Sequence, residues 1–194
     1  MIDRKDITGI ILAGGKSSRM KTDKGFLLLN NKPFIQYSID ALKPFVSEII
    51  VVTDDSKYDT LGLKRVNDIT KSAGPVAGIY SGLKASSTEY NVILSCDIPL
   101  ITSNIVKKLI DGIDETSDIV QIESNGKTMP LIALYKRKIK DKFNTLLQED
   151  ERRLRIAVKA CQLKNIILEK EFEFSTMNVN TQTDLKAVED AYKY

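Results

Sequence analysis

The most informative absence in this sequence of 194 residues is histidine, which does not occur at all. Its absence excludes the Ser–His–Asp triad, the Cys–His dyad, imidazole general bases and His-ligated zinc. Any chemistry must therefore use carboxylates, lysine, arginine or backbone groups. The only two cysteines, Cys96 and Cys161, are too few and too far apart for a disulfide framework or a CxxC metal site, so we expect a cytoplasmic protein.

Long apolar runs and an excess of one charge are also missing. The longest apolar run near the N-terminus covers only residues 10–13, so we expect neither a signal peptide nor a membrane span. The 29 basic residues are interspersed with 26 acidic ones, which gives a net charge of only +3. This balance favours neither nucleic acid nor a membrane as partner, and an anionic ligand would need a local basic patch.

The order of apolar segments predicts an α/β fold. Short β-branched runs alternate with amphipathic stretches of about ten residues, which is typical of parallel strands joined by crossover helices. Helices are predicted over 34–42, 79–84 and 105–113 and after Thr181, where Asp184 follows at the spacing of an N-terminal cap. Strands are predicted over 8–12, 48–53, 64–66, 91–95, 118–122, 131–135 and 165–168. Since no linker or composition break divides the chain, we expect a single domain over residues 1–194.

The first predicted strand runs into a loop that is rich in small and cationic residues, LAGGKSSRMKTDK at 12–24. Gly14 and Gly15 allow backbone N–H groups to approach an anion, and Arg19 and Lys24 can neutralise phosphate charge. A tight turn with solvated lysines is the alternative. The spacing of the glycines fits neither a P-loop nor the dinucleotide fingerprint GxGxxG.

Four motifs in a fixed order resemble the molybdenum cofactor guanylyltransferases, a family of nucleotidyltransferases. They are LAGG with the Arg-Met and Asp-Lys that follow, GPVAG at 74–78, CDIP at 96–99 and NVNT at 178–181. Each motif alone is weak, but together they span nearly the whole chain. The resemblance implies a three-layer, Rossmann-like nucleotide-diphospho-transferase fold with a mostly parallel central sheet. The asparagine that this family uses after its second strand to recognise the base has no clear counterpart here.

The resemblance also implies that the N-terminal half binds GTP. Asp97 follows an apolar strand, so its carboxylate should emerge at the carboxyl edge of the sheet, where Mg²⁺ would sit with the nucleotide. Taken alone, Asp97 is equally compatible with a cap or turn, and Asp68 with a turn. Gly74 and Gly78 fit a tight turn that opens a helix. The nucleotide-binding residues implied are Leu12, Ala13, Gly14, Gly15, Lys24, Asp68, Gly74, Gly78 and Asp97.

By resemblance, the reaction transfers GMP from GTP to the phosphate of molybdenum-molybdopterin and releases pyrophosphate. A phosphate nucleophile is already ionised at neutral pH, so the lack of histidine is no obstacle. Catalysis then rests on positioning and on charge neutralisation by Mg²⁺, Lys24 and Arg19. The proteins that deliver the cofactor and the molybdoenzymes that receive it are further implied partners.

The second half of the chain should bind the acceptor. Asn178 and Asn180 would face the same way on an extended segment and can hydrogen-bond a pterin, in agreement with the role that the family gives them. The arginines at 152, 153 and 155 bind the acceptor phosphate or form a solvated helix face. The basic residues between 136 and 142 are expected in solvent.

Two other functions are compatible with the same motifs. A transferase that uses CTP or a sugar phosphate is one, although the second glycine of LAGG favours guanine. A non-catalytic nucleotide- or pterin-binding module is the other. The presence of both Lys24 and Asp97 argues against the module, because binding alone has little need for a metal-binding aspartate at the transferred phosphate.

Overall fold

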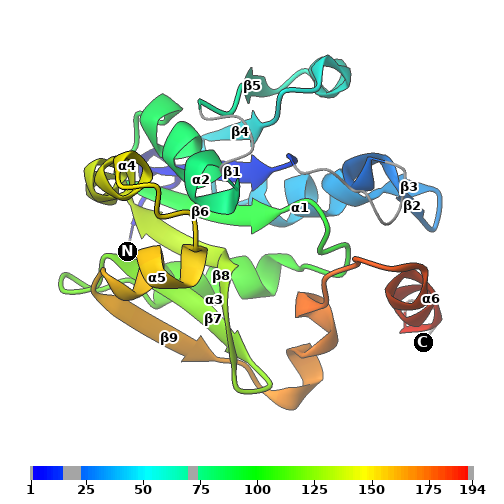
Figure 1. The fold of residues 1–194 in the computed structure, drawn as a ribbon. Helices are drawn as coiled ribbons and strands as arrows, with labels where there is room; N and C mark the ends of the chain where they lie inside the picture. Colours follow the sequence, from blue (N-terminus) through cyan, green and yellow to red (C-terminus); the bar gives the residue numbers. More distant parts are fainter. Residues whose placement is uncertain (1, 15–22, 70–73, 192–194) are drawn as a thin grey trace.

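A seven-stranded sheet runs through the centre of the computed structural model, which describes residues 2–14, 23–69 and 74–191 (Figure 1). Its strand order is β5-β4-β1-β6-β8-β7-β9, and only β8 runs antiparallel to its neighbours. The strands are β1 (Ile7–Leu12), β4 (Glu48–Val52), β5 (Lys64–Val66), β6 (Tyr90–Ser95), β7 (Ile119–Ser124), β8 (Lys127–Lys136) and β9 (Leu163–Ile167). The expected α/β class with a mostly parallel sheet is confirmed.

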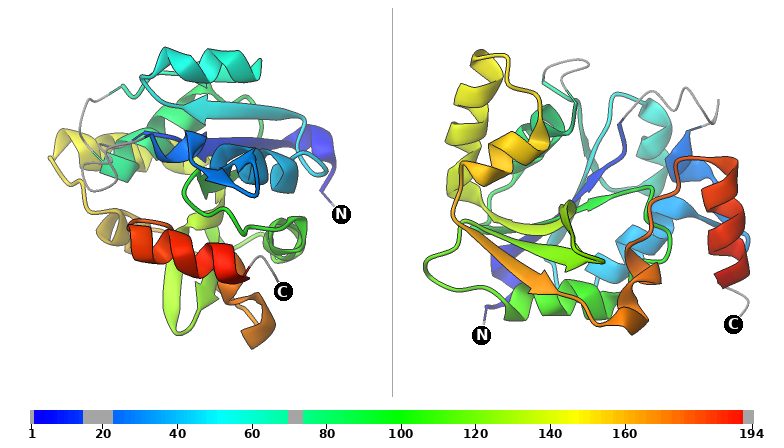
Figure 2. Two further views of the ribbon diagram at one scale, coloured as in Figure 1. Left: turned by 90° about the vertical axis from the view of Figure 1, so that its right-hand side faces the viewer. Right: turned by 60° about the horizontal axis from the view of Figure 1, so that its bottom comes forward.

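Helices cover both faces of the sheet, as Figure 2 also shows. One face carries α1 (Phe34–Leu42) and α3 (Ser103–Asp111), and the other carries α2 (Gly74–Ala85), α4 (Lys140–Gln148) and α5 (Leu154–Lys159). Side chains alternate along β1, so that Ile7 and Ile11 enter the core under α1 and α3 while Ile10 and Leu12 enter the opposite core. Two separate apolar cores therefore fix the sheet as the middle of three layers.

A small third core holds the C-terminal segment. It joins α6 (Gln182–Ala191) to the hairpin of β2 (Leu28–Leu29) and β3 (Lys32–Pro33), away from the main sheet. As expected, Thr181 caps α6: its hydroxyl accepts from the Asp184 N–H at 3.1 Å, and the Asp184 carboxylate accepts from the Thr181 N–H at 2.8 Å. This reciprocal cap fixes the backbone just after Asn180.

Several elements differ from the sequence-based expectation. The helix expected over 79–84 begins earlier, at Gly74, and the strand expected over 131–135 extends from Lys127 to Lys136. The hairpin, α4 and α5 were not predicted. The turn between β2 and β3 uses Asn30 and Asn31 at positive φ, which is the backbone that a two-residue hairpin loop requires. None of the helices in the described ranges combines the length and apolar character needed to cross a bilayer.

Lys136 corrects the expectation that the basic residues between 136 and 142 lie in solvent. Its side chain is buried, and its ammonium group donates to the carbonyl oxygens of Asp114 at 2.9 Å and Glu115 at 3.0 Å. The buried end of β8 thus uses a lysine to hold the loop before β7. Lys142, on α4, is exposed as expected.

We predict that Lys136→Met lowers the free energy of unfolding by about 1–3 kcal/mol, because two part-buried carbonyl groups lose their donor while the apolar stem is kept. Urea unfolding measures the change. The control is Lys142→Met, which should change stability by less than about 0.5 kcal/mol. Equal stability of the two variants would show that the Lys136 hydrogen bonds add nothing.

Candidate active site

Three side chains from three distant motifs meet beside the carboxyl edge of the sheet. The Lys24 ammonium group donates to Asp97 Oδ2 at 3.0 Å and to Asn180 Oδ1 at 2.5 Å. These contacts bridge 73 and 156 residues of sequence. The first loop, the end of β6 and the C-terminal segment therefore form one polar site.

Asp97 is held by groups on both sides of its carboxylate. The Ser95 hydroxyl donates to Oδ1 at 2.6 Å, and Lys24 binds Oδ2. The Asp97 backbone carbonyl also accepts from the Val179 N–H at 2.9 Å, which ties the segment before Asn180 to the end of β6. Within the described ranges, the carboxylate accepts from side chains and from no backbone amide, so Asp97 does not serve as a helix cap there.

Lys24 begins a short 3-10 turn, η2 (Lys24–Phe26). The preceding residue caps this turn, since Asp23 Oδ1 accepts from the Gly25 N–H at 3.0 Å. The Lys24 side chain is only 20% exposed and that of Asp97 14% exposed. Their attraction is therefore screened less by water than that of a surface pair.

The start of the first loop is built into the sheet. The Ala13 N–H donates to the Val52 carbonyl at 3.0 Å, and the Leu12 carbonyl accepts from the Cys96 N–H at 3.1 Å. Gly14 is exposed, and among the described residues a methyl group added there would come near the Val52 carbonyl oxygen alone, at 3.9 Å. Two predicted binding residues of this loop, Gly15 and Arg19, lie outside the described residues.

The remaining nucleotide-side residues gather around the start of α2. Asp68 follows β5, donates its N–H to Asp54 at 3.2 Å and accepts from the Ser81 hydroxyl of α2 at 3.3 Å. Gly74 has a φ of 73°, which favours glycine, and Gly78 packs against Leu12. The two glycines belong to α2 itself, so the expectation that Gly74 and Gly78 form a tight turn ahead of a helix at 79–84 is wrong.

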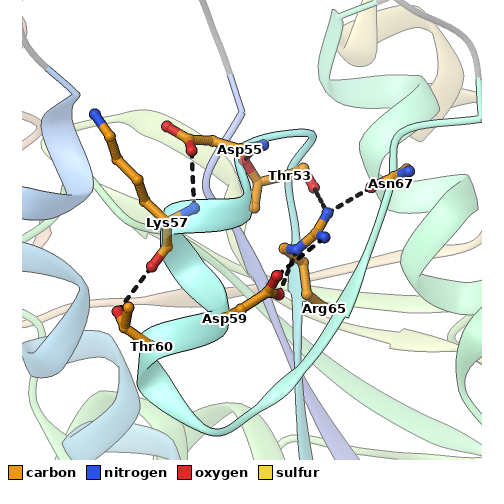
Figure 3. Close-up of polar contacts among 7 residues, drawn as sticks. All are labelled: Thr53, Asp55, Lys57, Asp59, Thr60, Arg65 and Asn67. Atoms are coloured by element: carbon orange, nitrogen blue, oxygen red, sulfur yellow. Dashed lines mark hydrogen bonds and ion pairs between the residues drawn. The ribbon is translucent and has the colours of Figure 1, made fainter.

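A polar network stiffens the segments that follow β4 and precede Asp68 (Figure 3). Arg65 Nε donates to Asp59 Oδ1 at 2.6 Å, and its Nη1 donates to Asn67 at 2.6 Å and to the Thr53 carbonyl at 3.3 Å. The Arg65 hydrogen bond lowers the pKa of the exposed Asp59 carboxyl below its ordinary value. Asp59 lies in the 3-10 helix η3 (Ser56–Leu61), so this network fixes η3 against β5.

Residues 9–164 match the family model of the MobA-like NTP transferase domain. The chain belongs to this family. The transferase is 36% identical over 179 residues to a probable molybdenum cofactor guanylyltransferase of Flavobacterium johnsoniae, covering 92% of this chain and 94% of the relative. It is 33% identical over 185 residues to the molybdenum cofactor guanylyltransferase of Yersinia pestis, covering 93% and 94%. The resemblance to this family is thus confirmed.

Solved structures share the fold of the MobA-like transferase. The molybdopterin-guanine dinucleotide biosynthesis protein A of Archaeoglobus fulgidus superposes with a TM-score of 0.81 at 22% identity, covering 96% of this chain and 98% of that one. The 4-diphosphocytidyl-2C-methyl-D-erythritol synthase of Anaerococcus prevotii superposes with a TM-score of 0.76 at 15% identity, covering 98% and 97%. At these identities the superpositions establish the nucleotidyltransferase fold and leave the base open.

The two asparagines of the transferase's NVNT motif differ in their contacts. Asn180 contacts Lys24, whereas Asn178 does not. The Asn178 Oδ1 atom is buried and has no hydrogen-bond partner in the described part of the chain. A buried acceptor without a donor is costly, so this unpaired oxygen needs an explanation.

The arginines at 152, 153 and 155 are exposed, and the first two form short-range ion pairs. Arg152 binds Asp150 at 2.7 Å, and Arg153 Nε donates to Glu151 at 2.8 Å. The Arg153 hydrogen bonds lower the pKa of Glu151 to about 2. The Arg152 carbonyl oxygen lies 3.9 Å from the position of a methyl group added at Gly74, so this segment borders the start of α2. Their role in acceptor binding stays a prediction.

Cys96, next to Asp97, has the properties expected of a core residue. It is 7% exposed and packs in the core under α1 and α3. Burial, with a smaller contribution from the Asp97 charge, raises the pKa of its thiol well above the ordinary value. The thiolate, which is the nucleophilic form, is therefore suppressed at neutral pH.

We predict that iodoacetamide at pH 8 leaves Cys96 of the folded transferase unmodified and reacts first with the less buried Cys161. Peptide mass spectrometry distinguishes the two sites, and both should react once the protein is unfolded in urea. Since the raised pKa keeps the Cys96 thiol protonated, a moderate rise in pH should not make it react with iodoacetamide. Rapid modification of Cys96 in the folded protein would contradict its assignment to the core.

Proposed function

We propose that this transferase moves GMP from GTP to the phosphate of molybdenum-molybdopterin, forming the molybdopterin guanine dinucleotide cofactor and releasing pyrophosphate. The observation that carries the proposal is the convergence of Lys24, Asp97 and Asn180. This arrangement joins a phosphate-binding cation, a metal-binding carboxylate and an amide of the acceptor half. The names of the two relatives support the choice of substrates.

The reaction needs no general base in this site. An acceptor phosphate oxygen attacks the α-phosphorus of GTP, the new P–O bond forms, and the bond to the β-phosphate breaks, with its electron pair leaving on pyrophosphate. Lys24 is placed to transfer its hydrogen bonds from Asp97 and Asn180 to phosphate oxygens as negative charge moves to the leaving group. Positioning and fixed charge then supply the catalysis.

The residues around Asp97 fit Mg²⁺. In the described ranges no cluster of three or more acidic or cysteine ligands occurs, so this part of the chain offers no complete cage for a metal. Mg²⁺ commonly takes one or two carboxylates and fills its shell with phosphate oxygens and water. Asp97 Oδ2 already accepts from a cation, Lys24. With nucleotide bound, Asp97 would hold the ion, whose charge would stabilise the triphosphate.

The proposed nucleotide half contains Leu12, Ala13, Gly14, Gly15, Arg19, Lys24, Asp68, Gly74, Gly78 and Asp97. The acceptor half contains Asn178 and Asn180, and the unpartnered Asn178 oxygen supports a pterin N–H as its donor. We take residues 1–194 as one functional unit. Proteins that deliver the cofactor and molybdoenzymes that receive it are the proposed partners, and the cytoplasm is the proposed location.

The nucleotide preference tests the proposal directly. We predict that pyrophosphate is released from GTP with Mg²⁺ and molybdopterin, and that ATP, CTP and UTP give little. Omission of molybdopterin should stop release, which excludes simple hydrolysis. Equal release from all four nucleotides would overturn the guanylyl assignment. Nucleotide binding without any release would favour the non-catalytic module.

We predict that Asp97→Asn lowers the transfer rate about a thousandfold, because a neutral amide is a poorer ligand for Mg²⁺. This loss corresponds to a rise of roughly 4 kcal/mol in the activation free energy. Circular dichroism should show that the variant stays folded. Asp111→Asn is the matched control, since it also removes the acidic partner of a lysine, Lys107, and both side chains are exposed on α3. If Asp97 were only a turn residue, both variants would keep their activity.

A further inference from the structure

Tyr58 packs against the turn that carries Lys24. It lies on η3, is only 1% exposed, and donates its hydroxyl hydrogen to Asp23 Oδ1 at 2.6 Å. The same carboxylate oxygen accepts from the Gly25 N–H. The Tyr58 hydroxyl and the Gly25 N–H therefore share one acceptor, Asp23 Oδ1. Asp23 and Gly25 are the residues directly before and after Lys24.

Gly25 marks how closely the turn approaches this ring. A methyl group added at Gly25 would lie 2.1 Å from the Tyr58 hydroxyl oxygen and 3.0 Å from two ring carbons. The Phe26 ring also contacts Tyr58, with 4.7 Å between the ring centroids. Asp23, Gly25 and Phe26 thus all rest on one side chain, while Lys24 reaches Asp97 and Asn180.

The Tyr58 hydroxyl is a persistent donor. Burial raises the pKa of Tyr58 well above its ordinary value, and the Asp23 hydrogen bond contributes to the rise. The phenol therefore stays protonated over the whole range in which an enzyme of this kind is assayed. The Arg65–Asp59 ion pair anchors η3 to β5 (Figure 3). Tyr58 lies on η3 and is therefore carried by a fixed support.

We propose that Tyr58 is a positioning residue for Lys24: its hydroxyl and ring hold the turn of Asp23–Phe26 so that the lysine ammonium group stays between Asp97 and Asn180. Tyr58 acts through this turn and contacts neither Asp97 nor Asn180 in the described ranges. The catalytic consequence rests on the proposed transfer reaction. The position of Lys24 can also be measured without that reaction.

The first experiment compares Tyr58→Phe with Tyr135→Phe. Tyr135 is a suitable control because it is also fully buried and donates its hydroxyl hydrogen to a carbonyl, that of Pro130, at 2.7 Å. It lies in the opposite core, under α2, α4 and α5. Both variants should melt at a somewhat lower temperature, but only Tyr58→Phe should lower kcat, about tenfold or more, with little change in KM for GTP. An equal effect of both variants on kcat would overturn the proposal.

A double-mutant cycle tests the contact itself. Gly25→Ala should lower kcat strongly in the natural protein, because the new methyl group collides with the Tyr58 hydroxyl. In the Tyr58→Phe background the closest clash is absent, so the same substitution should cost less. Strictly additive effects on kcat would show that Tyr58 and Gly25 act independently and would contradict the proposal.

The last readout does not depend on catalysis. The rate at which an amine-reactive reagent labels Lys24 is measured by peptide mass spectrometry, with the exposed Lys107 as internal reference. Tyr58→Phe should raise the relative labelling of Lys24 several-fold, and Tyr135→Phe should not. Unchanged labelling in Tyr58→Phe overturns the inference whatever the activity. If the natural protein fails to release pyrophosphate from GTP, the proposed function fails instead, and the labelling still decides the role of Tyr58.

Discussion

The ion pair between Lys24 and Asp97 is the interaction on which the site depends. Both side chains are largely shielded from water, and a shielded ion pair is stable only when its remaining polar atoms are also satisfied. Ser95 supplies a donor to the carboxylate, and Asn180 supplies an acceptor to the ammonium group. Ser95 and Asn180 thus complete the hydrogen bonding of the ion pair, whose charges neutralise each other in the absence of substrate. A magnesium-bound triphosphate would offer each partner a replacement: phosphate oxygens for the lysine and a metal ion for the aspartate.

Sheet topology explains why residues so far apart can form this pair. β1 and β6 are neighbours and parallel, with Leu12 in register with Ser95, so the loops that follow them leave the same edge side by side. The C-terminal segment returns to this edge through the hydrogen bond from Val179 to the Asp97 carbonyl. α6 and the hairpin then hold it there from outside the sheet. The parallel arrangement thus brings Lys24 and Asp97 together, and the C-terminal segment adds Asn180.

Much of the fold and part of the candidate site could be predicted from the sequence, but the reason differs from one element to another. The strands were found because they are short, β-branched and buried, and the cap of α6 because Thr181 and Asp184 have a distinctive spacing. The hairpin escaped prediction because two-residue strands leave no periodic pattern, and α4 because its charged residues outnumber its buried ones. The motif resemblance predicted that Lys24, Asp97 and Asn180 belong to one site. No local sequence pattern predicts that their side chains are in contact. Tyr58 had no signal at all, since its role depends on a turn 35 residues earlier in the chain.

Phosphate binding and base recognition also differ in how far the sequence predicts them. Phosphate binding requires charges at fixed positions, and in this chain the lysine, the carboxylate and their supports agree with the family pattern. A base can be recognised by backbone groups or by many polar side chains, so the loops after β4 and β5 are free to diverge. Here they carry Thr53 and Asp54 instead of the expected asparagine, and Asp54 accepts the backbone N–H of Asp68. The fold is shared with an enzyme named for a cytidyl product at 15% identity. Family and fold therefore account for nucleotidyl transfer, and we propose that the choice of base depends on the loops after β4 and β5 rather than on the Lys24–Asp97 pair.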